Sequence, residues 1–275
     1  MKTSFFFLVL FCVSVASAEI ADVNAMILTG QASRYHNWRE TSRTLKKHLN
    51  ASGRFTVDTV VAPQQGDDLS SFRPEFSSYD VVIVIYEGDD WPASTREAFV
   101  GYVKNGGGVV AVHATCNAFK TWEEWTRMLG IGNWSGSMYH PPKHDFPITI
   151  RNPGHPITRG LPQTWLHAYD ECYSGLRGPA ENLTVLATGY ADPSLKQASK
   201  KHEPVLMTIR YGKGRVFHTT LGHVGAKEHE PAKSIRCVGF LTTFTRGAEW
   251  AGTGRVTIPV PDDFPTAGET SVREN

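Results

Sequence analysis

The sequence GGGVVAVHATCNAF, residues 106–119, decides the fold class. Its glycines lead into an uninterrupted apolar run at residues 109–112, and the run stops at His113. Continuous β-branched runs of this kind are typical of strands that are buried on both faces of a parallel sheet. Ligands of open α/β sheets bind beyond the carboxyl ends of such strands. His113 therefore stands where a functional side chain is expected, and an unperturbed imidazole titrates near neutral pH.

Strand-like and helix-like segments alternate along the first half of the chain. The predicted strands are residues 26–29, 55–61, 81–86 and 109–112, and the predicted helices are residues 38–52, 93–103 and 122–129. This repetition predicts an α/β fold with a mostly parallel, flavodoxin-like central sheet and helices on both faces. Right-handed crossovers are expected to place the first, third and fourth strands side by side at the sheet centre.

The pattern changes after residue 129. Residues 130–147 are rich in glycine, proline and aromatic side chains. Loops of this length inside a domain are usually functional. We therefore expect this loop to form a wall or lid over a ligand pocket at the carboxyl ends of the strands. The YGKGR sequence at residues 211–215 predicts a hairpin and therefore an antiparallel edge of the sheet. The remaining predicted elements are strands at residues 146–150, 185–188, 204–211 and 215–220, and a final helix at residues 233–246.

The two ends of the chain differ in character from the middle. Residues 1–18 combine an early lysine, an apolar stretch and an Ala-Ser-Ala ending, which is typical of a signal peptide. We therefore expect an exported protein, periplasmic or secreted, with one α/β domain over residues 19–257. Residues 258–275 are expected to lie loosely on the surface. No other segment is apolar enough to span a membrane.

Charge and cysteine content argue against several classes of protein. The 28 basic and 27 acidic side chains give a net charge of +1, and no basic run is long enough to indicate a nucleic-acid surface. Cleavage of the signal peptide would leave Cys116, Cys172 and Cys237. An odd number without close spacing is not a disulfide framework, although one pair could form.

Polar segments follow four predicted strands, at residues 30–38, 87–91, 113–117 and 219–223. The convergence of polar groups from separate strand ends is how an α/β active site is built. The histidines and the acid that could contribute are His36, His113, His140, His144, His155, Glu171 and His223. His155 precedes a proline and is the member best explained by capping of a turn.

Two kinds of chemistry fit this set of side chains. His113 and His223, oriented by Glu171, could act as general base and general acid on an organic substrate. Alternatively, three or more of the imidazoles and carboxylates could bind a divalent metal such as zinc. Aromatic side chains near the same edge suit either a carbohydrate pocket or simple packing: Trp122, Trp125, Trp134 and Tyr139. The predicted substrate-binding residues are His36, Asn37, Asn117, Trp134 and His140.

Several separate segments, in order, resemble the ThuA-like family, which is named for trehalose utilisation. They are TGQASRYHNWRETS, NGGGVVAVHAT, HPITRGLPQTWLHAYDECY, VLATGY, EPVLMTIRYGKGRVFHTTLGH and RGAEWAGTG, and they span about residues 24–257. The resemblance implies a class I glutamine amidotransferase-like fold and the handling of sugars. Amidotransferases carry a nucleophilic cysteine at the turn that here holds His113, and Cys116 lies three residues further on. Glutamine hydrolysis through a thiolate is therefore disfavoured.

The sequence and the resemblance together predict an enzyme that acts on a sugar or an oxidised (keto) sugar, as a hydrolase, lyase or isomerase. The catalytic residues are expected to be His113, Glu171 and His223, and the partner a small-molecule carbohydrate. Two alternatives stay open, namely a non-catalytic carbohydrate-binding protein and a Cys116-dependent hydrolase. The oligomeric state is open as well.

Overall fold

The computed structural model describes residues 22–227 and 232–274. The predicted signal peptide lies outside the described residues. In the part of the chain that is described, no helix is both long and apolar enough to cross a membrane.

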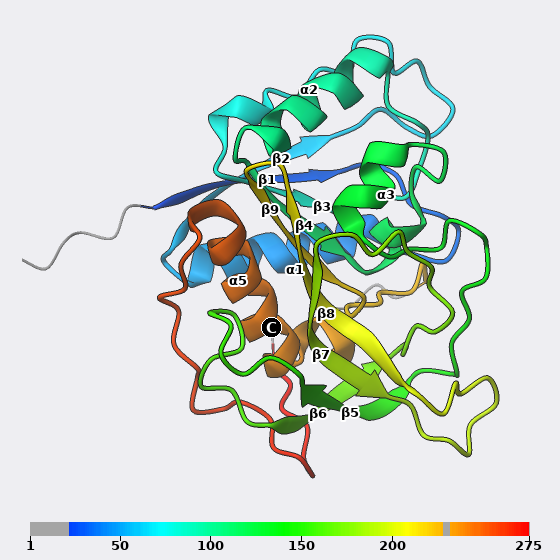
Figure 1. The fold of residues 1–275 in the computed structure, drawn as a ribbon, viewed down its shortest axis with the longest axis vertical. Helices are drawn as coiled ribbons and strands as arrows, with labels where there is room; N and C mark the ends of the chain where they lie inside the picture. The colour runs from blue at the N-terminus through cyan, green and yellow to red at the C-terminus, as the bar shows by residue number, and fades with distance from the viewer. Residues whose placement is uncertain (1–21, 228–231, 275) are drawn as a thin grey trace, which may run out of the picture.

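A nine-stranded mixed sheet runs through the whole molecule (Figure 1). Five strands are parallel, and the order across them is β2 (Phe55–Val61), β1 (Val23–Thr29), β3 (Val81–Val84), β4 (Gly108–Val112) and β9 (Gly214–Thr219). The sheet continues through four antiparallel strands, β8 (His202–Tyr211), β7 (Leu183–Tyr190), β5 (His144–Ile150) and β6 (Thr164–Asp170). The predicted α/β class, the adjacency of β1, β3 and β4, and the antiparallel edge are confirmed.

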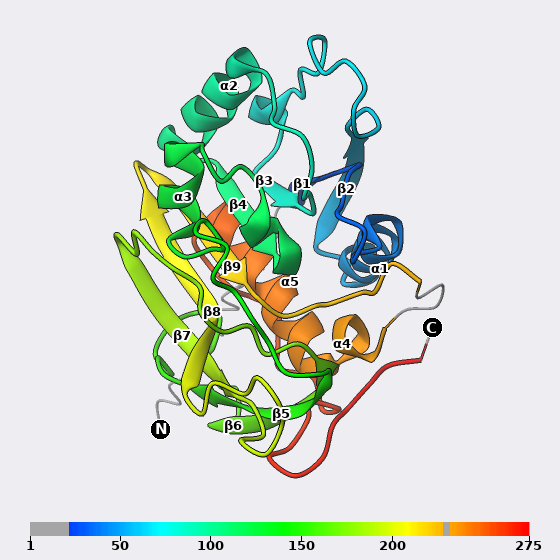
Figure 2. The same cartoon turned by 90° about the vertical axis from the view of Figure 1, so that its right-hand side faces the viewer.

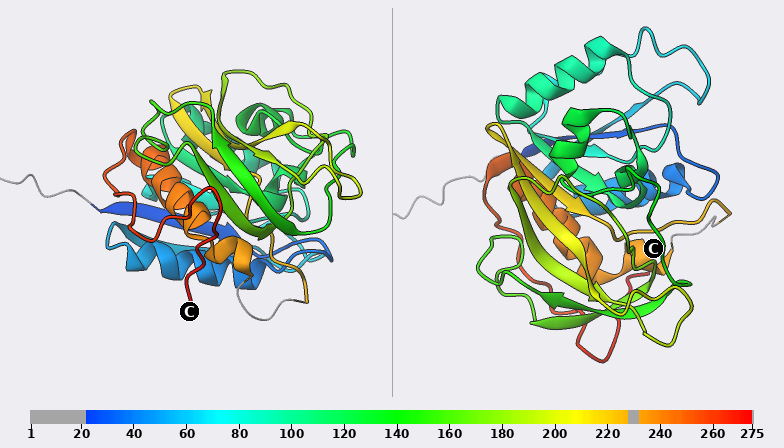
Figure 3. Two further views of the ribbon diagram at one scale, coloured as in Figure 1. Left: turned by 90° about the horizontal axis from the view of Figure 1, so that it is seen from below. Right: turned by 45° about the vertical axis from the view of Figure 1, so that its right-hand side comes forward.

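Helices cover both faces of the parallel part, as Figures 2 and 3 show. On one face lie α1 (Trp38–Ala51), α4 (Lys233–Arg236) and α5 (Val238–Thr253), and on the other lie α2 (Ala93–Lys104) and α3 (Glu123–Leu129). Side chains of a strand alternate between its two faces. In β4, Val110 and Val112 therefore belong to the core beneath α1 and α5, whereas Val109 and Ala111 belong to the core beneath α2 and α3.

Large apolar side chains fill both cores. Phe240 and Phe244 of α5 pack into the first, and Trp91 and Trp125 into the second. Complete burial of such a side chain stabilises the fold by about 1.5–3 kcal/mol. Two cores on a continuous sheet hold the carboxyl ends of β1, β3, β4 and β9 in fixed positions, and this matters for the site described below.

Two elements differ from the predictions. β6 was not predicted, because its buried face carries the polar residues His167 and Asp170, which obscure the apolar alternation. The final helix is interrupted at Cys237 and then continues to Thr253, seven residues beyond the predicted end at residue 246. Its last turns are also apolar, with Ala248 and Ala251 fully buried.

The segment after residue 257 runs over the surface and makes specific contacts with the domain. The Thr266 carbonyl accepts a hydrogen bond from the Leu166 N–H in β6, and the Ser271 carbonyl accepts one from the Val238 N–H at the start of α5. The Phe264 ring lies edge-on to Trp165, with 5.4 Å between ring centroids. These contacts tie the segment to β6 and α5.

Candidate active site

A cavity of about 570 Å³ opens beyond the carboxyl ends of the parallel strands. Its lining comes from the loops after β1, β3, β4 and β9, from residues 133–140 and from the segment after β6. The lining residues are Ser33, Tyr35, His36, Glu87, Asn117, Lys120, Asn133, Met138, His140, Glu171, Tyr173 and His223. All four polar segments expected at this edge therefore reach one cavity, and the 113–117 segment does so through Asn117.

His113 follows β4 in a strained backbone conformation, with φ of +46°. Residues other than glycine seldom adopt this left-handed region, and such strain is concentrated at functional sites. Its Nδ1 donates to the Thr220 carbonyl at 2.7 Å, so the Nε2 lone pair points toward the other site residues. Burial, and secondarily the His223 imidazole, lower the pKa of His113 to about 4. His113 is therefore a neutral imidazole near pH 7.

His223 lies in the loop after β9, four residues beyond Thr219, and is held in place by a buried carboxylate. Asp170 accepts hydrogen bonds from the backbone N–H groups of Glu171, Gly222 and His223 at 2.7, 2.7 and 3.1 Å. Gly222 has φ of +106°, a conformation that favours glycine. Asp170 thus fixes Glu171 and His223 relative to each other.

Glu171 lies at the centre of the site. Its Oε2 is 3.2 Å from His223 Nδ1 and 3.7 Å from both His113 Nε2 and His140 Nε2. Burial alone would raise the pKa of Glu171. The His223 hydrogen bond and the neighbouring imidazoles lower it by more than that, so the net shift is downward. Glu171 is therefore a carboxylate at neutral pH. Its contact with His113 is not an ion pair there, because His113 is neutral.

His36 completes a triangle of imidazoles. The ring centroids of His36, His113 and His223 lie 5.2 to 5.3 Å apart. Glu87 Oε2 accepts from His36 Nδ1 at 2.8 Å, and Asn117 Nδ2 donates to the other Glu87 oxygen at 3.1 Å. Burial opposes ionisation of Glu87, but the His36 and Ser33 contacts lower its pKa on balance.

One donor atom from each of four residues could reach a common point. The four are His36, His113, Glu171 and His223, and the donor atoms all lie within 4.8 Å of one another. Nitrogen and carboxylate oxygen donors are those that zinc and similar ions accept. The same arrangement also serves proton transfer, because His223 Nδ1 lies within hydrogen-bond reach of both Glu171 Oε2 and His113 Nε2.

The residues predicted for this site fall into three groups: those that line the cavity, one that lies beneath it, and those that lie elsewhere. His36, Asn117, His140, Glu171 and His223 line the cavity, and His113 lies directly beneath them, with its Nε2 3.2 Å from His223 Nδ1. The other predicted residues lie elsewhere, and they are Asn37, Trp134, His144 and His155. The ligand roles of all these residues remain predictions.

Asn37 and Trp134 have local roles that explain their positions. The Asn37 side chain accepts from the Glu40 N–H at 3.1 Å and so caps the start of α1. The Trp134 ring covers Gly132, where an added Cβ would lie 2.2 Å from the ring, and packs against the core beneath α2 and α3. His144 is held at the surface by the Pro142 carbonyl, and His155 caps a turn by accepting from the Ile157 N–H, as expected.

Three residues of the site were not named as individual candidates. Glu87 belongs to the polar segment at residues 87–91 that was expected at this edge, but it was left out of the set of histidines and acids. Tyr173, whose hydroxyl lies 2.8 Å from His113 Nε2, could have been found from its position two residues after Glu171. Asp170 gave no signal, because β6 itself was not recognised.

The thiol of Cys116 is not placed for nucleophilic chemistry. The side chain is fully buried among the apolar residues beneath α2 and α3. Burial, together with the negative charge of Glu87, raises its pKa well above the usual value, so the thiolate is strongly disfavoured. Cys116, Cys172 and Cys237 are all free and buried.

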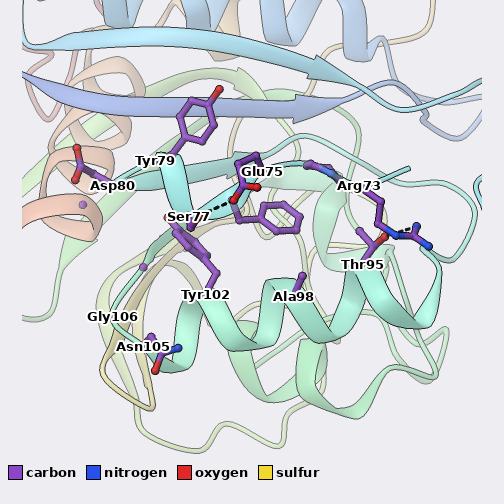
Figure 4. A pocket seen from close by; sticks show the side chains of 14 residues that line it. Arg73, Glu75, Ser77, Tyr79, Asp80, Thr95, Ala98, Tyr102, Asn105 and Gly106 are labelled. Carbon is purple, nitrogen blue, oxygen red and sulfur yellow. Dashed lines mark hydrogen bonds between the residues drawn. The ribbon is translucent and has the colours of Figure 1, made fainter. Parts of the chain in front are cut away.

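A second cavity, of about 640 Å³, lies at the opposite edge of the sheet (Figure 4). It is bounded by Asp80 before β3 and by residues 105–107 before β4, at the amino ends of these strands. Its two tyrosine hydroxyls are engaged within the protein, since Tyr102 donates to the Gly108 carbonyl and Tyr79 to Asp58. No histidine lines it. The cavity at the carboxyl edge is therefore the better candidate for chemistry.

The sheet order and the site together define an α/β domain of the class I glutamine amidotransferase-like type, with imidazoles and a carboxylate at the edge where ligands bind. The ThuA family model, described as trehalose utilisation, matches residues 24–251, and the chain belongs to this family.

Solved structures agree with this assignment. A ThuA-like protein from Parabacteroides merdae is 39% identical, with a TM-score of 0.87 over 93% of this chain and 100% of that one. A ThuA-like protein from Bacteroides uniformis is 21% identical, with a TM-score of 0.62 over 88% and 96%. A β-galactosidase from Rahnella shares the fold over 89% of this chain but only 33% of its own, with 18% identity and a TM-score of 0.51. No curated protein matches the chain.

Proposed function

We propose that the protein is an enzyme that acts on a sugar, or on an oxidised (keto) form of a sugar, by acid–base or metal-assisted chemistry. One observation carries this proposal: a carboxylate and an imidazole meet on the floor of an open cavity, with Glu171 Oε2 3.2 Å from His223 Nδ1. Paired titratable groups in a cavity at the carboxyl edge of a sheet are typical of α/β enzymes. The family description, trehalose utilisation, supports a sugar as the substrate.

In the metal-free form of this chemistry, Glu171 is the general base and His223 is the general acid. Glu171, ionised at neutral pH, takes a proton from a sugar hydroxyl or from the carbon beside a keto group. His223, in its protonated form, gives a proton to the oxygen on which negative charge develops. It regains a proton from Glu171 across their 3.2 Å contact, so both groups return to their starting states. His113 touches His223 from below and acts as a positioning residue, because Thr220 fixes its tautomer.

The rest of the cavity suits a polar, ring-shaped ligand. Its volume of about 570 Å³ lies within the range of about 300–1,000 Å³ that small-molecule sites occupy. Asn117 and Asn133 offer amide groups to hydroxyls, and the exposed ring of Tyr35 offers a face for stacking. These contacts would also serve a non-catalytic carbohydrate-binding protein, which is the alternative function.

One experiment separates catalysis from binding. The full chain is incubated with trehalose, other disaccharides and their keto derivatives, and the sugar signals are followed by NMR. Conversion of at least one sugar to new signals supports an enzyme. Line broadening without conversion supports the binding protein, and no effect on any sugar contradicts both.

A further inference from the structure

We propose that His36, His113, His223 and Glu171 bind one divalent transition-metal ion, of the zinc type, at the floor of the cavity. The ion would serve the proposed sugar chemistry, so its catalytic meaning rests on the proposed function, whereas its binding does not. No residue outside these four is needed to hold it.

The separations between donor atoms fit a single ion. Zinc–nitrogen bonds of about 2.0–2.1 Å in a tetrahedron place neighbouring donors about 3.3 Å apart. His113 Nε2 lies 3.2 Å from His223 Nδ1, and Glu171 Oε2 lies 3.2 Å from His223 Nδ1 and 3.7 Å from His113 Nε2. The His36 donor lies within 4.8 Å of each of these atoms. A shift of up to about 1.5 Å in the His36 donor would complete the set.

Groups behind two imidazoles orient their free nitrogens inward. Metal-bound histidines almost always donate their other ring N–H to a carboxylate or a backbone carbonyl. His36 uses Nδ1 to contact Glu87, and His113 uses Nδ1 to contact the Thr220 carbonyl. Both therefore direct Nε2 toward the common centre.

Burial and charge also favour an ion. The side chains of the four residues are 4% to 13% exposed, so they are already desolvated and held by packing. As metal ligands, the three imidazoles would add no charge and Glu171 would add one negative charge, which a divalent ion would more than balance. Glu87 and Asp170 add negative charge behind the donors.

One contact competes with the ion. The Tyr173 hydroxyl lies 2.8 Å from His113 Nε2 and uses the lone pair that a metal would need. Binding must break this hydrogen bond and free the hydroxyl toward the cavity. Tyr173→Phe should therefore bind the ion at least as tightly as the natural protein, and this distinguishes a metal site from a hydrogen-bonded imidazole cluster.

The test is a titration of chelator-stripped full-length protein with Zn²⁺, in competition with a chromophoric chelator. We expect one equivalent to bind. His113→Ala and His223→Ala should each weaken binding more than tenfold, and Glu87→Gln by about 10- to 100-fold. His144→Ala removes an imidazole that lies outside the cavity; it is the matched control and should bind normally. Melting curves of the stripped variants verify that each is folded.

Three outcomes separate the site from its function. Binding of less than a tenth of an equivalent, or equal binding by the His113→Ala and His223→Ala variants, overturns the metal site. Sugar conversion that persists unchanged in the stripped protein overturns the catalytic role of the metal ion, while the proposed function stands. One-to-one binding without conversion of any sugar leaves the site standing and contradicts the proposed function.

Discussion

At the scale of single residues, the site depends on a few buried groups whose protonation is set by their neighbours. His113 is neutral because it is buried, and Glu171 is ionised because imidazoles surround it. Asp170 does not itself line the cavity, yet it accepts hydrogen bonds from the backbone of both Glu171 and His223. It also contacts His167 at 2.8 Å, and both side chains are fully buried.

Asp170→Asn should therefore destabilise the fold strongly. Removing one partner of a buried charged pair costs about 3–5 kcal/mol, because the other partner is left uncompensated. Urea unfolding at pH 7 measures this cost. Asp145→Asn removes an exposed carboxylate that accepts from the Tyr169 N–H and should cost less than about 1 kcal/mol. Equal effects of the two substitutions would contradict the positioning role of Asp170.

Cys116→Ala tests the thiolate alternative at the same scale. Because the thiol is buried and its pKa is raised, the variant should keep sugar conversion within about twofold and lose about 1 kcal/mol of stability. Initial rates and a melting curve measure both quantities. Complete loss of conversion with sugar binding intact would instead support a Cys116-dependent hydrolase.

At the scale of elements, the loop between α3 and β5 plays two parts. Its Asn133, Met138 and His140 form one wall of the cavity, as expected for the 130–147 excursion. Trp134, which was expected to stack on the sugar, instead packs on the core side of the same loop. The loop thus supports the wall from beneath with one aromatic ring.

Trp134→Ala and His140→Ala should separate these two parts. We expect Trp134→Ala to lose up to about 3 kcal/mol of stability, which is the lower end of the range for aromatic-to-alanine substitutions in a core. The loss should be at this end because the ring is only partly buried. Sugar affinity should be unchanged. His140→Ala should weaken sugar binding and leave the melting temperature nearly unchanged. Calorimetric titration and thermal melting measure both. The reverse pattern would restore the stacking role of Trp134.

At the scale of the whole molecule, most of the architecture could be predicted and most of the detailed geometry could not. Apolar runs ending in polar residues placed His36, His113 and His223 at one sheet edge, because the carboxyl ends of parallel strands share an edge. Side-chain partners such as Thr220 behind His113 depend on long-range packing, which no local pattern records. β6 and Asp170 were missed for the same reason, since their buried polar groups pair with distant residues.

Buried neutral histidines predict acid sensitivity of the whole fold. Burial lowers the pKa of His218 in β9 to about 4, against an opposing hydrogen bond to the Leu129 carbonyl. The unfolded chain takes up this proton below about pH 6.5 and the folded chain does not, so stability falls as the pH drops from 6.5 toward 4. The loss is at most about 1.4 kcal/mol per pH unit for this residue.

Urea unfolding with chelator present, at pH 7.5 and pH 5, measures the effect. The natural protein should lose more stability between the two conditions than His218→Gln does. Equal losses would contradict a lowered pKa for His218.

We also propose that the protein is exported, because residues 1–18 have the pattern of a signal peptide. The mature protein recovered from its native host should begin at Glu19, as mass spectrometry of the intact protein would show. A mature form that retains Met1 and is confined to the cytoplasm would contradict export.

The central claim is that the carboxylate and imidazoles at the carboxyl edge perform chemistry on a sugar. The most direct measurement uses a sugar that the natural protein converts in the NMR experiment. It compares the conversion of this sugar by the natural protein and by Glu171→Gln, which preserves the size of the side chain. We predict that conversion falls by about 10²- to 10⁴-fold, the usual contribution of a general acid–base group, while the variant stays folded. Conversion by a folded Glu171→Gln variant at the natural rate would contradict the claim.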